Sequence, residues 1–446
     1  MVLLIVVPIV VQNGITNFVN LLDNLMVGRM GTEEMSGVAI VNQLIFVFNL
    51  CIFGGFSGAG IFTAQYNGMD DAQGIRNTFR FKILLGIVMT AIALIVFLTA
   101  GNSLIKMYLN DSASSGSNER VLAYGNAYLR IMFVGLLPFA FVQAYSSTLR
   151  ECGETLFPMI AGIVAVTVNL VFNWLLIFGH CGFPRMGVEG AAIATVLSRF
   201  VEMALVVCRT HTCRDRYPFA RELYSTMKIP SELVRRIVKT GSPLLINEAL
   251  WSAGMAFLTQ CYSMRGLNAV AGFNIANTVI NLFNVVLYSM GNTVGIIIGK
   301  LLGAGKQEEA VDTDRKLIAF SVMLCCGVSL LLMSVSSVFP AIYNTNDEAK
   351  SIAKSIIIVA AVFLPTEAFK NATYFTLRSG GRTWITFAFD SCFVWTVSVP
   401  IAFCLSRFTS LSVSALYICV SSGGMIKVFI GYYLVKKRVW LNNIVS

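Results

Sequence analysis

Charged residues are scarce in this chain. Asp, Glu, Lys and Arg together make up 13% of its 446 residues, whereas a soluble globular protein has about 25%. Hydrophobic residues account for 56%, and the mean hydropathy is +0.73. This composition excludes an ordinary soluble domain and indicates an integral membrane protein.

The sequence also lacks the motifs of catalysis and of metal binding. It has no HExxH helix and no nucleophile–base arrangement, and GGFSGAG (54–60) follows no strand pattern, so it fits close helix packing better than a phosphate loop. The eleven cysteines have no metal-ligand spacing, and His211 with Cys213 supplies only two candidate ligands. No cleavage site follows the first apolar run, which argues against a cleavable signal peptide. We therefore expect neither an enzyme nor a resident cofactor, and any energy source would be an ion gradient.

Long apolar runs are what the sequence has in abundance. Twelve of them can cross about 30 Å of hydrocarbon at 1.5 Å per residue. The predicted spans are 3–27, 37–66, 79–101, 121–146, 157–179, 188–208, 237–262, 270–299, 317–339, 350–377, 384–405 and 411–435. The connection 210–236 divides the chain into a lobe at 1–209 and a lobe at 237–446, which ends in a short tail. Most Lys and Arg residues in the connections follow even-numbered spans, so the positive-inside rule predicts that both termini and the 210–236 linker are cytoplasmic.

The two halves of the chain repeat each other. Residues 235 positions apart match at Pro8 and Pro243, Gly31 and Gly266, Asn42 and Asn277, and Gly60 and Gly295. Each repeat contains an even number of spans, so an axis along the membrane normal relates the two copies. We predict an all-α integral membrane fold, with twelve transmembrane helices in two pseudo-symmetric six-helix bundles and a central cleft. That is a transporter architecture.

The first span carries the most costly side chain. A carboxylate at membrane depth costs about 2.5–3.5 kcal/mol on insertion scales, so Asp23 is a functional candidate. The repeat places Leu258 at its counterpart position, so the acid does not belong to the shared scaffold. We expect Asp23 to bind the coupling cation or the substrate, with the amides Gln12, Asn13 and Asn20 lining the same helix. The alternative is an acid near the outer interface that caps the helix or pairs with Arg29.

Other spans contain further polar residues. The candidates are Asn42, Asn169 and Asn173 in the first half, and Glu248, Asn277, Glu367 and Asp390 in the second. An amide in a span either lines a binding site or joins two helices, with a hydrogen bond worth about 0.6 kcal/mol.

Each acid of the second half also has a structural alternative. Glu367 can pair with Lys370 one turn away, Glu248 can form a structural hydrogen bond, and Asp390 can be held by Asn or Lys neighbours. If they do function in coupling, these acids can take up a proton or help to bind Na⁺. We expect a Na⁺ ion, where there is one, near Asp23 or near Glu248 and Glu367.

Several short motifs carry a family resemblance. They are DNLMVGRMG (23–31) after Pro8, LRECGET (149–155), GVEGAAIAT (187–195) and LRSGGRT (377–383). With Asn169 and Asn173 in the fifth span, they make the chain resemble the multidrug and toxic compound extrusion (MATE) family over essentially its whole length. In that family the acid of the first helix, which matches Asp23, is associated with cation coupling or substrate release. The Na⁺-linked acids of some members lie in the seventh and tenth helices, where Glu248 and Glu367 stand.

The resemblance implies a secondary active antiporter that works by alternating access. It would export organic, lipophilic cationic compounds in exchange for H⁺ or Na⁺. The alternative is a flippase for lipid-linked saccharides or another amphiphile, which acidic candidate residues suit less well. The expected partners are a small organic substrate and membrane lipid, with no nucleic acid. We expect a multi-pass monomer in a prokaryotic plasma membrane.

Overall fold

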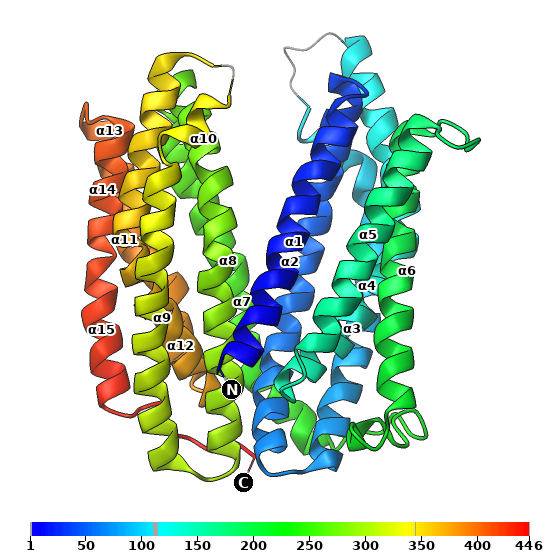
Figure 1. Ribbon diagram of the computed structural model, residues 1–446, viewed down its shortest axis with the longest axis vertical. Helices are drawn as coiled ribbons and strands as arrows, with labels where there is room; N and C mark the ends of the chain where they lie inside the picture. Colours follow the sequence, from blue (N-terminus) through cyan, green and yellow to red (C-terminus); the bar gives the residue numbers. More distant parts are fainter. Residues whose placement is uncertain (1, 110–114, 344, 446) are drawn as a thin grey trace. The chain divides into compact units, whose positions relative to one another are not determined.

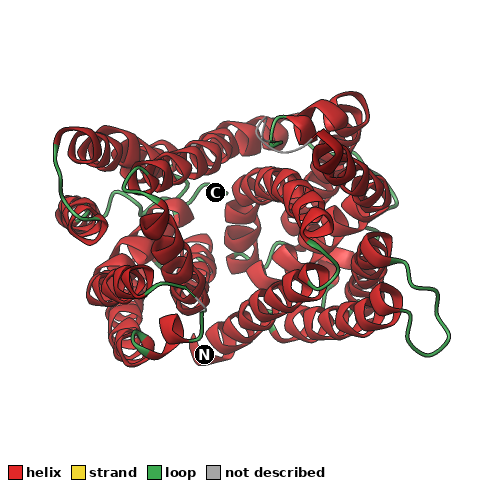
Figure 2. Ribbon diagram, turned by 90° about the horizontal axis from the view of Figure 1, so that it is seen from above, coloured by secondary structure: helices red, strands yellow, loops and turns green. Residues whose placement is uncertain are grey.

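The computed structural model of the chain describes residues 2–109, 115–343 and 345–445. Within these ranges, helices make up nearly all of the regular structure and no residue forms a strand (Figure 2). Eleven of the described helical segments are long and apolar enough to cross a membrane. The predicted all-α membrane fold is confirmed.

The first compact unit consists of Leu3–Thr63 and Ala72–Arg235. Its helices are α1 (Val2–Gly28), α2 (Thr32–Gly68), α3 (Ala72–Lys106), α4 (Ser115–Glu151), α5 (Leu156–Phe178), α6 (Gly187–Thr212) and the short 3₁₀ helix η1 (Pro218–Ala220). Helix α6 packs along both α4 and α5 (Figure 1). Gly179 ends α5 with a left-handed φ of 74° and donates its N–H to the Leu175 carbonyl, as glycine commonly does at a helix C-terminus.

The second compact unit consists of Ala64–Asp71 and Arg236–Ser446. Its helices are α7 (Ser231–Ser263), α8 (Leu267–Gly303), α9 (Gln307–Val335), α10 (Val338–Ala341), α11 (Asp347–Ser379), α12 (Thr383–Phe387), the π turns η2 (Ala388–Cys392) and η3 (Val394–Ser398), α13 (Val399–Phe408), α14 (Val413–Gly423) and α15 (Met425–Lys436). Helix α11 packs against α8 and α9. The segments Gln307–Ala341, Thr383–Phe408 and Val413–Lys436 each join shorter helices into one span.

All twelve predicted spans fall on helices, but one differs in character. The predicted span 237–262 lies in α7, which is not among the eleven apolar segments. Its interior carries Asn247 and Glu248, which lower its hydropathy. Lipid offers no hydrogen bonds to these polar side chains, so we expect them to contact neighbouring helices.

The second unit has a hydrophobic core where the first unit has its acid. Leu258, the repeat counterpart of Asp23, is 6% exposed and belongs to a cluster with Tyr262, Phe273 and Leu416. The two units therefore use the same repeat position differently, one for apolar packing and one for a carboxylate.

The segment 440–445 is folded against the second unit and does not form a free tail. Trp440 is 1% exposed. The Ile444 N–H donates to Gln65 Oε1 at 2.8 Å, and Gln65 Nε2 donates to the carbonyls of Ser379 at 2.9 Å and Asn442 at 3.2 Å. Because Gln65 has no exposed surface, this segment completes the hydrogen bonding of a buried amide.

Candidate functional site

The structure brings Asp23 together with both predicted asparagines of α5. Asn173 Nδ2 donates to Asp23 Oδ1 at 2.7 Å. The amide of Asn169, oriented so that its nitrogen faces the acid, donates to Oδ1 at 3.0 Å and Oδ2 at 2.9 Å, while its oxygen accepts from Thr195 Oγ1 at 3.3 Å. Asn169 and Asn173 are four residues apart, so they share one face of α5. The carboxylate of α1 is therefore solvated by two amides from a neighbouring helix.

A second layer surrounds this group. Tyr128 of α4 is 4% exposed and donates its hydroxyl to Asn42 Oδ1 at 3.3 Å. It lies within electrostatic range of Asp23 and of Thr195 on α6. The site thus draws on α1, α2, α4, α5 and α6. Sequence reasoning included Asn42 but missed Tyr128 and Thr195, because neither residue type stands out in an apolar span.

In the described part of the chain, the Asp23 carboxylate has no direct ion-pair partner. Among the described residues, no Lys, Arg or His nitrogen lies within 4.0 Å of its carboxylate. The alternative partner Arg29 is exposed. Arg199 favours the charged acid through longer-range attraction, but it pairs with Glu202 at 3.9 Å and lies over the Phe139 ring. The acid can therefore accept a proton or a cation without displacing a bound basic side chain.

Gln12 of α1 lies away from this group. Gln12 is eleven residues before Asp23, about 16 Å along the helix at 1.5 Å per residue. It packs on Gly162 of α5, and its Oε1 is buried with no hydrogen-bond partner in the described part of the chain. Asn13 is half-buried in the same region, and the side chain of Asn20 lies outside the described residues. The polar side chains of α1 therefore lie in at least two separate places and do not form the continuous lining that we predicted.

In the second unit, Asp390 is held by a lysine. Lys427 Nζ of α15 lies 2.7 Å from Asp390 Oδ1, and the two side chains are 13% and 17% exposed. Asn247 of α7 donates to the other carboxylate oxygen at 3.1 Å. Ser391, the next residue in the π turn, donates its hydroxyl to Asn247 Oδ1 at 2.7 Å. This arrangement matches the structural alternative, in which Asn and Lys neighbours hold the acid.

The other candidates of the second unit are more dispersed. Glu367 pairs with Lys370, as the spacing of one turn predicts, and Lys370 is buried. Glu248 is half-buried and lies within electrostatic range of Arg378 and Asp390. Asn277 is half-buried in α8. Two of the three candidate acids in this unit therefore already have an ammonium partner, in contrast to Asp23. The described residues contain no group of three or more His, Cys, Asp or Glu side chains placed to hold a metal.

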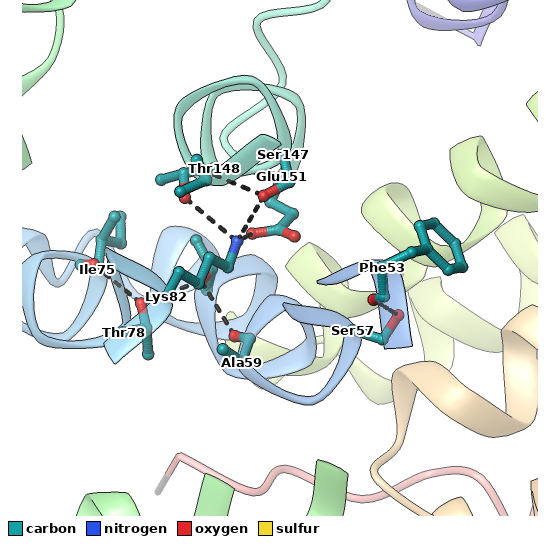
Figure 3. A network of polar contacts seen from close by, with 11 residues as sticks. Phe53, Ser57, Ala59, Ile75, Thr78, Lys82, Ser147, Thr148 and Glu151 are labelled. Carbon is teal, nitrogen blue, oxygen red and sulfur yellow. Dashed lines mark hydrogen bonds and ion pairs between the residues drawn. The ribbon is translucent and has the colours of Figure 1, made fainter. Parts of the chain in front are cut away.

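A separate charged network of the first unit joins α3 to α4. Lys82 has no exposed surface, and its Nζ donates to Ser147 Oγ at 3.1 Å, Thr148 Oγ1 at 3.1 Å and Glu151 Oε2 at 2.5 Å (Figure 3). All three ammonium protons thus have acceptors. Glu151 belongs to the LRECGET motif, so this part of the motif serves to fasten two helices together.

Comparison with known proteins places this geometry in a family. A family model described as MatE matches residues 8–175 and 243–404. The probable multidrug resistance protein NorM of Thermotoga maritima is 23% identical over 92% of this chain and 86% of its own. The probable multidrug resistance protein YoeA of Bacillus subtilis is 24% identical over 96% and 92%. The solved outward-facing structure of a multidrug resistance MATE family transporter of the MOP superfamily matches with a TM-score of 0.86 and 20% identity over 98% of this chain and 95% of that chain.

Proposed function

Since the chain belongs to the MatE family and is a membrane transporter and not an enzyme, we propose that it exports organic cations in exchange for H⁺ or Na⁺, with Asp23 as the coupling site. The relatives named above as multidrug resistance proteins support an organic substrate. The observation that carries the coupling role is the half-buried Asp23 carboxylate, which binds amides but no basic side chain within ion-pair distance in the described structure.

The two halves support different roles for their acids. A coupling site must bind and release its cation in every cycle. Asp390 and Glu367 have tethered ammonium groups, Lys427 and Lys370, beside them, so a free cation would have to displace a side chain. At Asp23 the neighbours are amides, so we assign ion coupling to the first unit.

Amides suit an acid that changes charge. A side-chain amide carries both a donor nitrogen and an acceptor oxygen. Towards the carboxylate, Asn169 and Asn173 present their nitrogens. Once Asp23 is protonated or holds Na⁺, either side-chain amide can rotate so that its oxygen replaces its nitrogen. That oxygen then accepts a hydrogen bond from the protonated acid or binds the metal ion. The same two residues can therefore stabilise the loaded and the empty state, and a lipophilic organic cation can compete for the acid when it is empty.

The experiment is gradient-driven transport with purified protein. Wild type, Asp23→Asn and the control Asp70→Asn are reconstituted in liposomes, and ethidium movement is followed under an imposed pH gradient or an imposed Na⁺ gradient. Asp70 is exposed in a turn with a φ of 56°, which Asn also tolerates. We expect wild type and Asp70→Asn to respond to one of the two gradients, and Asp23→Asn to lose the response at an equal amount of inserted protein.

Two results would contradict the proposal in different ways. Normal gradient-driven transport by Asp23→Asn would remove the coupling role from this residue. A wild-type protein that moves none of a panel of cationic dyes under either gradient would argue against cation antiport itself. Movement of a lipid-linked saccharide in that case would favour the flippase alternative.

A further inference from the structure

An apolar groove of about 360 Å³ lies on the first unit, between the adjoining ends of α5 and α6. It is lined by Phe157, Ala204, Leu205, Cys208, Arg209 and Thr212. Arg209 is the one lining residue with a charge. None of these residues belongs to the group around Asp23, so the groove is a separate feature of the same unit.

The position of the groove along the helices places it at a bilayer boundary. Phe157 is in the first turn of α5, and Arg209 and Thr212 are in the last turn of α6. Both helices are long and apolar enough to span a membrane, which places these end residues at headgroup depth. Ala204 is eight residues before Thr212, about 12 Å deeper at 1.5 Å per residue. The groove therefore runs from the polar boundary into the hydrocarbon, whichever side of the membrane it faces.

Arg209 is available to a ligand. Its guanidinium carbon lies 5.5 Å from the centroid of the Phe157 ring, a cation–π contact that fixes the side chain beside the groove. Among the described residues, no carboxylate lies within 4.0 Å of it. The nearby acid Glu154 accepts instead from Arg216, from the Tyr217 hydroxyl and from the Phe157 N–H. The N–H donors of the Arg209 guanidinium group are therefore available to an anionic ligand.

We propose that this groove binds an anionic phospholipid, with its phosphate on Arg209 and the first part of an acyl chain along Ala204, Leu205 and Cys208. Guanidinium and phosphate match in charge and in geometry, because two parallel N–H groups can donate to two phosphate oxygens. The positive charge of Arg209 would repel an organic cation. A free phosphate would leave the apolar part of the groove unused. A lipid with a net negative headgroup satisfies both parts, and this binding is independent of the transport proposed above.

Cys208 provides a direct probe, because it is an exposed thiol inside the groove. The protein is reconstituted either in phosphatidylcholine vesicles or in the same vesicles with phosphatidylglycerol, and treated with N-ethylmaleimide. Peptide mass spectrometry then measures the alkylation rate of each cysteine. We expect phosphatidylglycerol to slow the alkylation of Cys208 by about tenfold, which corresponds to about 1.4 kcal/mol. Cys404, an exposed thiol of the second unit, should react at the same rate in both.

Variants separate the lipid from other causes of protection. Arg209→Gln should abolish the effect of phosphatidylglycerol on Cys208, whereas Arg214→Gln, an exposed arginine five residues further on, should keep it. The thermal unfolding midpoint in phosphatidylcholine verifies that both variants are folded. Equal protection in the two lipid mixtures, or full protection in Arg209→Gln, would overturn the proposal. Protection by ethidium or by glycerol phosphate as strong as that by phosphatidylglycerol would also overturn it, in favour of a substrate or a free phosphate.

Discussion

Replacing Lys427 by Met would leave Asp390 as a carboxylate in the membrane interior without its counter-ion. The pair is mostly buried, and its atoms are 2.7 Å apart. Methionine has nearly the length of lysine, so the substitution removes the charge and keeps most of the packing. Asn247 would remain as a donor to the acid at 3.1 Å. One amide hydrogen bond replaces little of the attraction that an ammonium group supplies.

Removal of one member of a buried ion pair costs about 3–5 kcal/mol. The destabilisation of Lys427→Met should therefore be large at pH 7. Removing both charges, in Asp390→Asn with Lys427→Met, should cost less than about 1.5 kcal/mol, because no isolated charge remains.

Thermal unfolding followed with a thiol-reactive fluorophore can test this order of stabilities. Cys261 and Cys325 of the second unit are 3% and 1% exposed, so they react only when the fold opens. We expect the midpoint at pH 7 to fall in the order wild type, double variant, Lys427→Met. A Lys427→Met protein that melts with wild type at pH 7 would refute the reasoning, as would a double variant no more stable than the single one.

Two further substitutions test the other polar networks. Lys82→Met should destabilise the first unit by about 3–5 kcal/mol, because it strips the counter-ion from a buried carboxylate. The exposed Lys106→Met is its control in the same unfolding assay, and equal midpoints would contradict the role of the network. Gln65→Ala should cost about 1–3 kcal/mol and leave buried backbone groups unpaired. It should speed limited proteolysis at the segment around Trp440 relative to the exposed control Gln43→Ala, and unchanged cleavage would show that the segment is held by other contacts.

The sequence was sufficient to find Asp23 and the two asparagines that donate to it. A carboxylate in an apolar span is costly enough to need a reason, and Asn169 and Asn173 share a helix face at a spacing of four. The sequence also grouped Gln12 with Asp23 as part of a polar lining on the same helix. Eleven residues are close to three full turns, so the two side chains leave the helix in similar directions. A shared direction around the helix axis does not bring two side chains together, however, because three turns along the axis separate Gln12 from the site.

Partners from different helices were beyond the reach of one sequence. The Glu367–Lys370 pair was predictable because a single turn determines it. Lys427 is 37 positions from Asp390, and their contact depends on how α15 packs beside the π turn. Tyr128 and Thr195 carry no distinguishing signal, because both residue types occur throughout apolar helices. Contacts within one helix could therefore be predicted from the sequence, whereas contacts between helices required the structure.

The contact between Ile444 and Gln65 spans 379 positions of sequence. During synthesis at about 5–20 residues per second, Gln65 leaves the ribosome roughly 20–75 s before its last partner exists. For that time the end of α2 contains an amide that its final surroundings have not yet satisfied. The second unit can therefore reach its finished form only after residue 444 has been synthesised, and a ribosome that stalls before that point would expose an incomplete protein to membrane proteases.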